Sequence, residues 1–418
     1  MFAGGKLFCI EGRVFFQWLF VPERHRGPPS HSFSINRSGM EDPMKELSVN
    51  VVVRPKEYRI VIEAGLLNNL ALELKRNPLG KRYAIITDTI VNPLYAEPLC
   101  RNLREAGIPA QVYAFAHGEA SKTRQTKEWL ENSLLDDGFG RDSAILAVGG
   151  GVVGDVAGFV AATYMRGVPF AQIPTTTLAQ VDSSIGGKTA VDVPQGKNLI
   201  GAFHHPAVVY MDPQALMSLD ERNYCGGLVE LVKHGFIADA EFLAFYQQNQ
   251  QTILARSGTE YTGVMEELML RNCRIKNEVV RLDEQETNLR KILNYGHTLG
   301  HGVEILSDFL LSHGESVAVG IGFAAYLAWR LGFCTKETME TQMDVLEGLG
   351  MPCRIPDSIT AEQLIRVMSM DKKAKDGKAE FVLLESVGKV KRAADGDCAQ
   401  KIAPDVVRAM IDEYKNMG

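Results

Sequence analysis

Three histidines and a glutamate have the types and spacing that metal chemistry requires. Asn294, His297 and His301 follow one another at i+3 and i+4 spacings, which predicts one shared helical face. His313 comes twelve residues later at a predicted helix start, and Glu230 lies within an apolar helical stretch. One carboxylate and two imidazoles leave a fourth position open, which is the pattern of catalytic zinc. The spacing differs from His-Glu-x-x-His, so a protease is unsupported, and buried core histidines are the alternative interpretation.

A glycine-rich turn indicates nucleotide binding. The segment GGGVVGD, residues 149–155, follows a predicted strand and precedes a predicted helix, so its glycines could approach a pyrophosphate at a helix N-terminus. The pattern is not the standard G-x-G-x-x-G, and a tight structural turn is the alternative. Upstream, Glu119 and Lys122 follow a strand end, where they could hold ribose hydroxyls and phosphate. An exposed helix start explains these two residues equally well.

Lysines beside glycines predict a pocket for an anion. Lys188 in IGGK and Lys197 in QGK stand nine residues apart, near Asp182, with Asn198 next to the second lysine. Charges in glycine-flanked loops favour binding of a phosphate or carboxylate over a solvated helix face. Arg166, in YMRG, is a third cation nearby in the sequence.

Other charged residues surround the histidine-bearing segment in the sequence. Lys233 lies one turn beyond Glu230, whereas Lys276 and Arg290 precede the histidines. By themselves Lys276 and Arg290 would be surface charges, which is the ordinary position of such side chains. The segment DKKAKDG, residues 371–377, is likewise predicted to be a solvated turn unless it closes over the site.

The elements that must position these residues fall into two groups. Strands are predicted at residues 47–53, 58–65, 82–89, 111–116 and 143–151, with helices at 94–106 and 122–137. Such alternation implies parallel βαβ units, and after about residue 212 helical periodicity dominates. We therefore expect a Rossmann-like α/β domain with a mostly parallel sheet over residues 44–218. We expect a mostly α-helical domain over residues 219–418, with the active site in the cleft between the two.

Composition and charge restrict the class of partner. The chain has 418 residues and a formal net charge of −6, so we expect neither a nucleic-acid nor a membrane partner. Its seven cysteines are scattered and form no Cys-x-x-Cys pair, which favours reduced thiols in the cytoplasm. The sequence contains no run of eighteen apolar residues, so we expect no membrane-spanning helix. The composition of residues 1–43 predicts a disordered leader, or a sequence start placed too far upstream. A targeting or interaction role for these residues stays open.

Several segments together match the motifs of one enzyme family in order. They are GGGVVGD, YMRG, PTTTLAQVDSSIGGK, GKNLIGAF, GLVELVKHG, LRKILNYGHTLGH, SHGE and DKK. With them the chain resembles the 3-dehydroquinate synthases, of the sugar phosphate cyclase superfamily, from about Val51 to its C-terminus. The resemblance implies a lyase of the shikimate pathway that depends on NAD and on zinc or cobalt. Such an enzyme converts 3-deoxy-D-arabino-heptulosonate 7-phosphate into 3-dehydroquinate and phosphate. It does so by transient oxidation, phosphate elimination, re-reduction and intramolecular aldol closure.

The resemblance also implies roles for individual residues. Glu230, His297 and His313 correspond to the metal ligands. Contacts to NAD are implied for Asp88, Glu119, Lys122, Gly150, Gly151, Val152, Asp155, Thr175, Thr176, Lys188 and Lys197. Catalytic or substrate-binding roles are implied for Asp182, Lys188, Asn198, Lys233, Lys276, Arg290, Asn294, His301 and one of Lys372 and Lys373. Arg166 corresponds to a residue that reaches the neighbouring subunit's site, which implies a homodimer.

Three alternatives stay open. Another sugar phosphate cyclase would act on a neutral-headed substrate, whereas Lys276, Arg290, Asn294 and His301 together favour a substrate with a carboxylate. A metal-dependent polyol or glycerol dehydrogenase would share the fold and the glycine turn, but it would leave the paired lysines without a function. A non-catalytic binding module is disfavoured because so many charged groups converge on one metal-like site.

Overall fold

The computed structural model describes residues 6–10, 13–17, 57–308, 310–370 and 378–417. Its strands are β1 Lys6–Ile10, β2 Arg13–Gln17, β3 Arg59–Ile62, β4 Arg82–Asp88, β5 Ala110–Phe115, β6 Ser143–Gly149, β7 Phe170–Pro174, β8 Lys188–Val193, β9 Gly196–Phe203, β10 Val208–Met211, β11 Ala379–Phe381, β12 Leu384–Ser386, β13 Lys389–Val390 and β14 Gln400–Ile402. Its α-helices are α1 Leu66–Arg76, α2 Glu97–Glu105, α3 Arg124–Asp136, α4 Gly151–Thr163, α5 Glu221–Ala238, α6 Ala240–Ala255, α7 Tyr261–Leu282, α8 His297–Leu306, α9 His313–Arg330, α10 Lys336–Gly348, α11 Ala361–Met370 and α12 Pro404–Lys415. Residues 1–54 and residues 55–418 form two separate units.

A six-stranded sheet organises the first part of the larger unit, in the order β3-β10-β7-β6-β4-β5. Every pair of neighbouring strands in it is parallel. Strands with both faces covered are expected to be continuously apolar, and β6 and β10 are buried along their whole length. The predicted Rossmann-like α/β fold with a mostly parallel sheet is confirmed.

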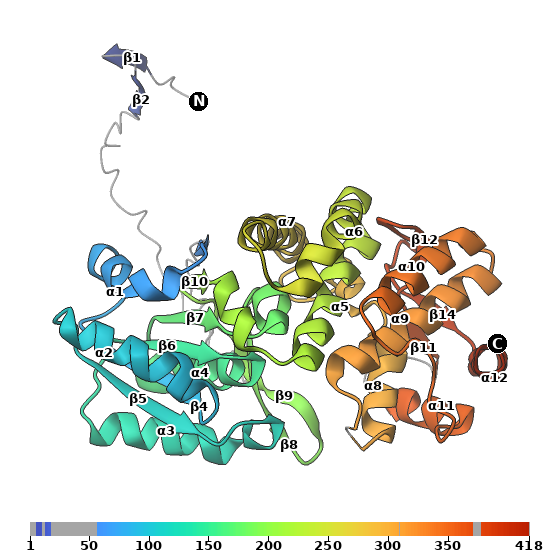
Figure 1. The fold of residues 1–418 in the computed structure, drawn as a ribbon, viewed down its shortest axis with the longest axis horizontal. Helices are drawn as coiled ribbons and strands as arrows, with labels where there is room; N and C mark the ends of the chain where they lie inside the picture. Colours follow the sequence, from blue (N-terminus) through green and yellow to red (C-terminus); the bar gives the residue numbers. More distant parts are fainter. Residues whose placement is uncertain (1–5, 11–12, 18–56, 309, 371–377, 418) are drawn as a thin grey trace, which may run out of the picture. The chain divides into compact units, whose positions relative to one another are not determined.

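Successive residues of the sheet face two different apolar clusters because side chains alternate along a strand. On β4, Ile85 packs in the cluster that contains Leu70 of α1 and Leu103 of α2. Its neighbour Ile86 packs in the cluster that contains Leu134 of α3, together with apolar residues of α4. Helices therefore cover both faces of the sheet (Figure 1). Polar residues lie where its strands end, such as Asp88 at the end of β4.

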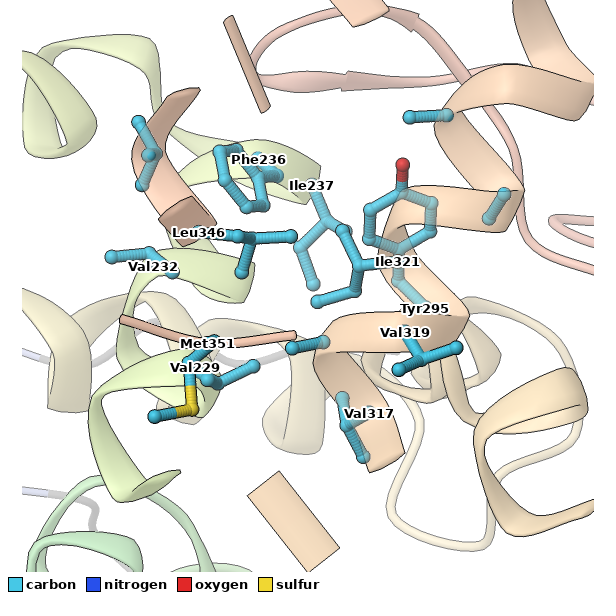
Figure 2. Close-up of a cluster of buried hydrophobic side chains, with 14 of the residues drawn as sticks. Val229, Val232, Phe236, Ile237, Tyr295, Val317, Val319, Ile321, Leu346 and Met351 are labelled. Carbon is cyan, nitrogen blue, oxygen red and sulfur yellow. The ribbon is translucent and has the colours of Figure 1, made fainter. Parts of the chain in front are cut away.

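Helices dominate the chain from α5 onward, as predicted. Helix α5 is almost entirely buried, and so is α9, which is why their sequences are apolar on nearly every face. Figure 2 shows Ile237 of α5 beside Ile321 of α9 and the ring of Tyr295, in one continuous cluster. These two helices form the rigid base on which the charged residues of the site lie.

The boundaries of most predicted elements agree with the structure to within a few residues. The segment at 143–151 is strand β6 followed directly by α4, and the strand expected at 82–89 is β4. The strand expected at 47–53 lies outside the described residues. Among the described residues up to 17, β1 pairs antiparallel with β2. The disordered leader and the division of the chain at residue 218 stay predictions.

One part of the prediction was wrong in kind. The two glycine-flanked lysine segments are not loops but the strands β8 and β9, which pair antiparallel across Pro194 and Gln195. The β-branched alternation of KTAVDV, residues 188–193, suits a strand. The glycines before each lysine favoured a loop and led to the wrong prediction. In the part of the chain that the structure describes, no helix is long and apolar enough to cross a membrane.

Candidate active site

Three side chains from three different helices converge on one point. Glu230 lies in the middle of α5, while His297 and His313 are the first residues of α8 and α9. The Glu230 Oε1 atom lies 3.5 Å from His297 Nε2 and 3.6 Å from His313 Nε2. One ligand atom from each residue lies within 4.8 Å of the other two, which is close enough for one ion to contact all three.

The second nitrogen of each imidazole has an acceptor that fixes the ring. His297 Nδ1 lies 3.1 Å from the carbonyl oxygen of Tyr295, and His313 Nδ1 lies 3.4 Å from Glu304 Oε2. With a proton on each Nδ1 donated to these acceptors, both Nε2 atoms face Glu230 and are the nitrogens that can bind a metal. Metal-binding histidines are held in this way by carbonyl and carboxylate partners. The donor set therefore fits a divalent cation such as zinc or cobalt.

The charges of this group favour an ionised carboxylate. Burial by itself would raise the pKa of Glu230, but the Lys233 ammonium and then the two imidazoles hold it well below its usual range. Burial lowers the pKa of His297 to about 3. Burial opposes protonation of His313 as well, yet hydrogen bonds to Glu230 and Glu304 outweigh it and raise the pKa of His313 to about 9. Because a histidine must be neutral at the nitrogen that binds a metal, metal binding at His313 depends on pH.

Asn294 does not share a helix with the histidines, contrary to the prediction. It ends a separate 3-10 helix, Leu289–Asn294, and α8 begins only at His297. Between them Gly296 has a φ of +81°, and the carbonyl of Gly296 lies against Gly320 of α9. The spacing of Asn294, His297 and His301 suits one helix, but the left-handed backbone of Gly296 interrupts that helix. His301 is exposed on α8, with its ring centroid 5.2 Å from that of His297.

Buried cations line the same region from the side of α5 and α7. Lys233 forms an ion pair with Glu230 and donates to the carbonyl of Leu293 at 2.6 Å. Lys276 of α7 is 4% exposed and lies 2.7 Å from Asp182 Oδ1. Burial would raise the pKa of Asp182, but Lys276 and Lys233 lower it below its ordinary value. Lys276 and Asp182 join the helical part of the chain to the part that contains the sheet.

Arg290 is buried on the 3-10 helix before α8. Its guanidinium donates to the carbonyl of Glu284 at 2.5 Å and to that of Gly186 at 3.3 Å. A surface position was the default expectation for Lys276 and Arg290 from composition, and the structure contradicts it for both, because each has buried acceptors to satisfy its charge.

The β8–β9 hairpin carries two more lysines toward these residues. Lys188 pairs with Glu286, and the same carboxylate accepts from Asn294 Nδ2 at 2.5 Å. Lys197 lies 2.9 Å from Glu304 Oε1 and 3.8 Å from Glu119.

Asn198 follows Lys197 on β9 and has a left-handed backbone. Its φ is +56°, and its amide N–H donates to Asp192 Oδ1 at 2.8 Å. Asp192 thus holds the hairpin in the shape that presents Asn198 and Lys197.

The glycine turn has little space for side chains. Gly150 caps α4, a helix of 13 residues, and a Cβ added there would lie 3.0 Å from Thr176 Cγ2. A Cβ on Gly151 would lie 3.1 Å from Ser183 Oγ. The hydroxyl oxygen of Thr175 is buried and has no hydrogen-bond partner among the described residues. Free backbone at a helix N-terminus beside an unsatisfied hydroxyl fits the pyrophosphate of a dinucleotide.

Other residues predicted to contact NAD lie around this turn. Lys122 and Asp155 form an ion pair at 2.6 Å, and Val152 lies on α4 next to the glycines. Asp88 ends β4 and accepts from the N–H groups of Ile90 and Val91, each at 2.9 Å. The carboxyl ends of β4, β6 and β7 thus bring the predicted nucleotide contacts to one edge of the sheet.

Three residues named in the prediction cannot be placed in this group. Arg166 is exposed after α4, with a φ of +66° and no ion-pair partner in the described part of the chain. Lys372 and Lys373 lie outside the described residues.

Known sequences identify the family. A sequence profile described as 3-dehydroquinate synthase N-terminal matches residues 112–226, and one described as 3-dehydroquinate synthase C-terminal matches residues 227–374. A 3-dehydroquinate synthase from Symbiobacterium thermophilum is 42% identical over 355 residues, which are 84% of this chain and 96% of that relative. The chain belongs to the 3-dehydroquinate synthase family.

Solved structures place this member of the 3-dehydroquinate synthase family among related cyclases. A 2-deoxy-scyllo-inosose synthase, crystallised with carbaglucose-6-phosphate, NAD+ and Co2+, is 26% identical with a TM-score of 0.76; the match covers 85% of this chain and 97% of that one. A 2-epi-5-epi-valiolone synthase from Streptomyces hygroscopicus, with NAD+ and Zn2+ bound, is 25% identical with a TM-score of 0.78; the match covers 88% and 99%.

Sequence reasoning missed Glu304 and the buried His234. Glu304 had a usable signal, since it stands three residues after His301 and seven after His297 on one helix. His234 had none, because it lies in the apolar helix α5. Its Nδ1 atom lies 2.6 Å from Asn272 Oδ1 and its Nε2 lies 3.9 Å from Asp182, while burial lowers its pKa to about 4.

Proposed function

We propose that this chain is a 3-dehydroquinate synthase that converts 3-deoxy-D-arabino-heptulosonate 7-phosphate into 3-dehydroquinate and phosphate. The observation that carries the proposal is the convergence of Glu230, His297 and His313 beside buried lysines in a chain of this family. The reaction belongs to the shikimate pathway and involves no net oxidation, because one hydride is removed from the substrate and later returned to it.

Two bound groups are needed for this chemistry. A divalent cation held by Glu230, His297 and His313 would polarise a ring hydroxyl and stabilise negative charge on its oxygen. NAD+ held at the glycine turn would accept a hydride from the same carbon and return it after phosphate has left. The protein's own task is to hold one substrate conformer against both groups, and such positioning supplies much of the acceleration.

The surrounding cations would bind the anionic ends of the substrate. The Nε atom of Arg290 is buried and has no hydrogen-bond partner among the described residues, so it can donate to a carboxylate. The charge of Arg290 also acts on the buried ammonium of Lys276, so the two cations lie in one region of the site. Lys188 and Lys197 would bind phosphate, and His301 is exposed next to the metal ligands, where it can exchange a proton.

The assembly and the compartment are part of the proposal. We place Arg166 in the site of a second copy, so that the working enzyme is a homodimer. The exposed side chains of Leu199, Ile200 and Phe203 on β9 support an interface near this hairpin. Six cysteines are free thiols, which supports the cytoplasm: Cys100, Cys225, Cys273, Cys334, Cys353 and Cys398.

Phosphate release from the heptulosonate phosphate tests the reaction. The protein with NAD+ should release phosphate without accumulating NADH, a chelator should abolish the release, and added zinc or cobalt should restore it. Steady NADH accumulation with glycerol, and no phosphate release, would instead identify a dehydrogenase.

Replacement of Arg290 tests the substrate's carboxylate. Arg290→Ala should lower kcat/KM for the heptulosonate phosphate by about a hundredfold, because a charged hydrogen-bond donor is lost. Arg281→Ala is the control, since Arg281 is exposed on α7 and pairs with Glu278. Undiminished turnover by Arg290→Ala would mean that the carboxylate is bound elsewhere or is absent from the substrate.

A further inference from the structure

Glu304 contacts two groups of the site at once, although no motif assigned it a role. It lies on α8, and its side chain is 10% exposed. One oxygen, Oε1, lies 2.9 Å from Lys197 Nζ, and the other, Oε2, lies 3.4 Å from His313 Nδ1. The carboxylate is therefore fully engaged between a lysine of β9 and a histidine of α9.

The contact between Glu304 and His313 determines which ring nitrogen of His313 can bind a metal. Its Nε2 atom faces Glu230 at 3.6 Å, and its Nδ1 atom faces Glu304. A carboxylate can only accept, so Nδ1 carries a proton toward Glu304, and Nε2 is the nitrogen left to bind a metal beside Glu230. The other ligand, His297, receives the same help from a backbone carbonyl, that of Tyr295. His313 depends instead on a side chain, which a substitution can remove.

We propose that Glu304 is the positioning residue that fixes the tautomer and orientation of His313 for the metal and that joins this ligand to Lys197 of the β8–β9 hairpin. The inference rests on the proposed function. Through Glu304, the metal position and the lysine beside the nucleotide are held by one carboxylate, so both lose their geometry together when it is removed.

A direct metal contact is the competing role for Glu304. His301, Glu304 and His313 also bring one ligand atom each within 4.8 Å of one another. That arrangement would use His313 Nδ1 as the ligand and turn its lone pair away from the buried Glu230. Glu230 is fully buried beside both imidazoles, so the first arrangement satisfies more of the buried charge.

Cobalt binding to metal-free protein distinguishes these roles. Wild type, Glu304→Gln, Lys197→Met and the control Glu267→Gln would be titrated with Co2+ at pH 8.5 against a chelating dye, and the visible absorption of bound Co2+ recorded. Glu267 suits as the control because it pairs with Arg271 on α7, outside the site. Thermal unfolding of each metal-free protein checks that the fold is intact.

The expected result is a Co2+ Kd raised ten- to a hundredfold in Glu304→Gln, with the absorption bands of wild type. Lys197→Met and Glu267→Gln should change the Kd less than threefold, because His313 keeps its acceptor in both. A Glu304→Gln Kd within threefold of wild type would overturn the proposal, and altered bands would overturn it by making Glu304 a direct ligand. Failure of wild type to bind Co2+ would instead count against the proposed function.

Discussion

Carboxylates of the chain itself pair with several lysines of the site before any ligand arrives. Asp155 pairs with Lys122, Asp182 with Lys276, and Glu286 with Lys188. For the buried Lys122 and Lys276, such a pair favours the charged ammonium, which burial alone would disfavour. An anionic substrate must then share or displace these carboxylates, which makes binding depend on competition between charges rather than on empty positions.

Removal of one partner from a buried ion pair tests whether the two charges stabilise each other. Lys122 is 4% exposed, so Lys122→Met should leave Asp155 with an uncompensated charge and lower the free energy of unfolding by about 3 kcal/mol. Urea denaturation measures the loss. The double variant Lys122→Met with Asp155→Asn should recover at least a third of it, and a double variant no more stable than the single one would contradict the pairing argument.

Short connecting segments, rather than the long helices, determine where most site residues lie. Asp283 ends α7 and accepts from the backbone N–H groups of Thr287 and Asn288 at 2.8 Å and of Arg290 at 3.0 Å. These hydrogen bonds shape the loop that carries Glu286 and Arg290. The same carboxylate therefore has a structural role and a direct effect on the position of the guanidinium.

The pH dependence of stability tests Asp283 at the scale of this loop. The backbone donors outweigh burial and lower the pKa of Asp283 below its ordinary value. Its contribution is therefore present above the unfolded pKa of about 4 and is lost as the pH falls through the lower folded value. Asp283→Asn should cost about 2 kcal/mol at pH 7, and the difference from wild type should shrink toward pH 3. The exposed Asp136→Asn is the control; an undiminished difference at pH 3 would refute the assignment.

The close packing of α8 on α9 also determines where a site residue lies. A Cβ on Gly320 would lie 1.8 Å from the carbonyl oxygen of Gly296, the residue just before His297. Gly320→Ala should therefore lower the free energy of unfolding by about 3 kcal/mol or more and weaken metal binding by displacing His297. Gly263→Ala on α7 is the matched control, because a Cβ there meets nothing within 4 Å. It should be neutral or slightly stabilising. Equal effects of the two variants would exclude the packing explanation.

At the scale of the whole molecule, the site is assembled from the sheet, the hairpin and the helices α4, α5, α7, α8 and α9. Asp182 to Lys276 and Lys197 to Glu304 are ion pairs that join the sheet-containing part to the helical part. In the proposed homodimer, the exposed Arg166 would be the residue that a second copy adds to the site.

Mixing two inactive variants tests the homodimer. Arg166→Ala and His297→Ala should each abolish activity, and a mixture after subunit exchange should regain about a quarter of wild-type activity, because half the dimers then contain one complete site in two. Light scattering establishes the dimer independently. A mixture no more active than its components would place Arg166 in its own subunit or outside the site.

The sequence alone determined which chemistry was available and which elements would carry it. The apolar pattern around Glu230 predicted α5, the strand before Gly149 predicted the nucleotide turn, and the motif order predicted the family, because each depends on local periodicity and residue type. Only the tertiary structure decided that Glu230, His297 and His313 share one point, since they are far apart in the chain and meet through the packing of α5, α8 and α9. The tertiary structure also places Asn294 outside α8, and the lysine segments form a β-hairpin instead of loops. It places Glu304 next to His313. Each of these depends on backbone contacts between distant segments, such as Gly296 against Gly320, that no local pattern records.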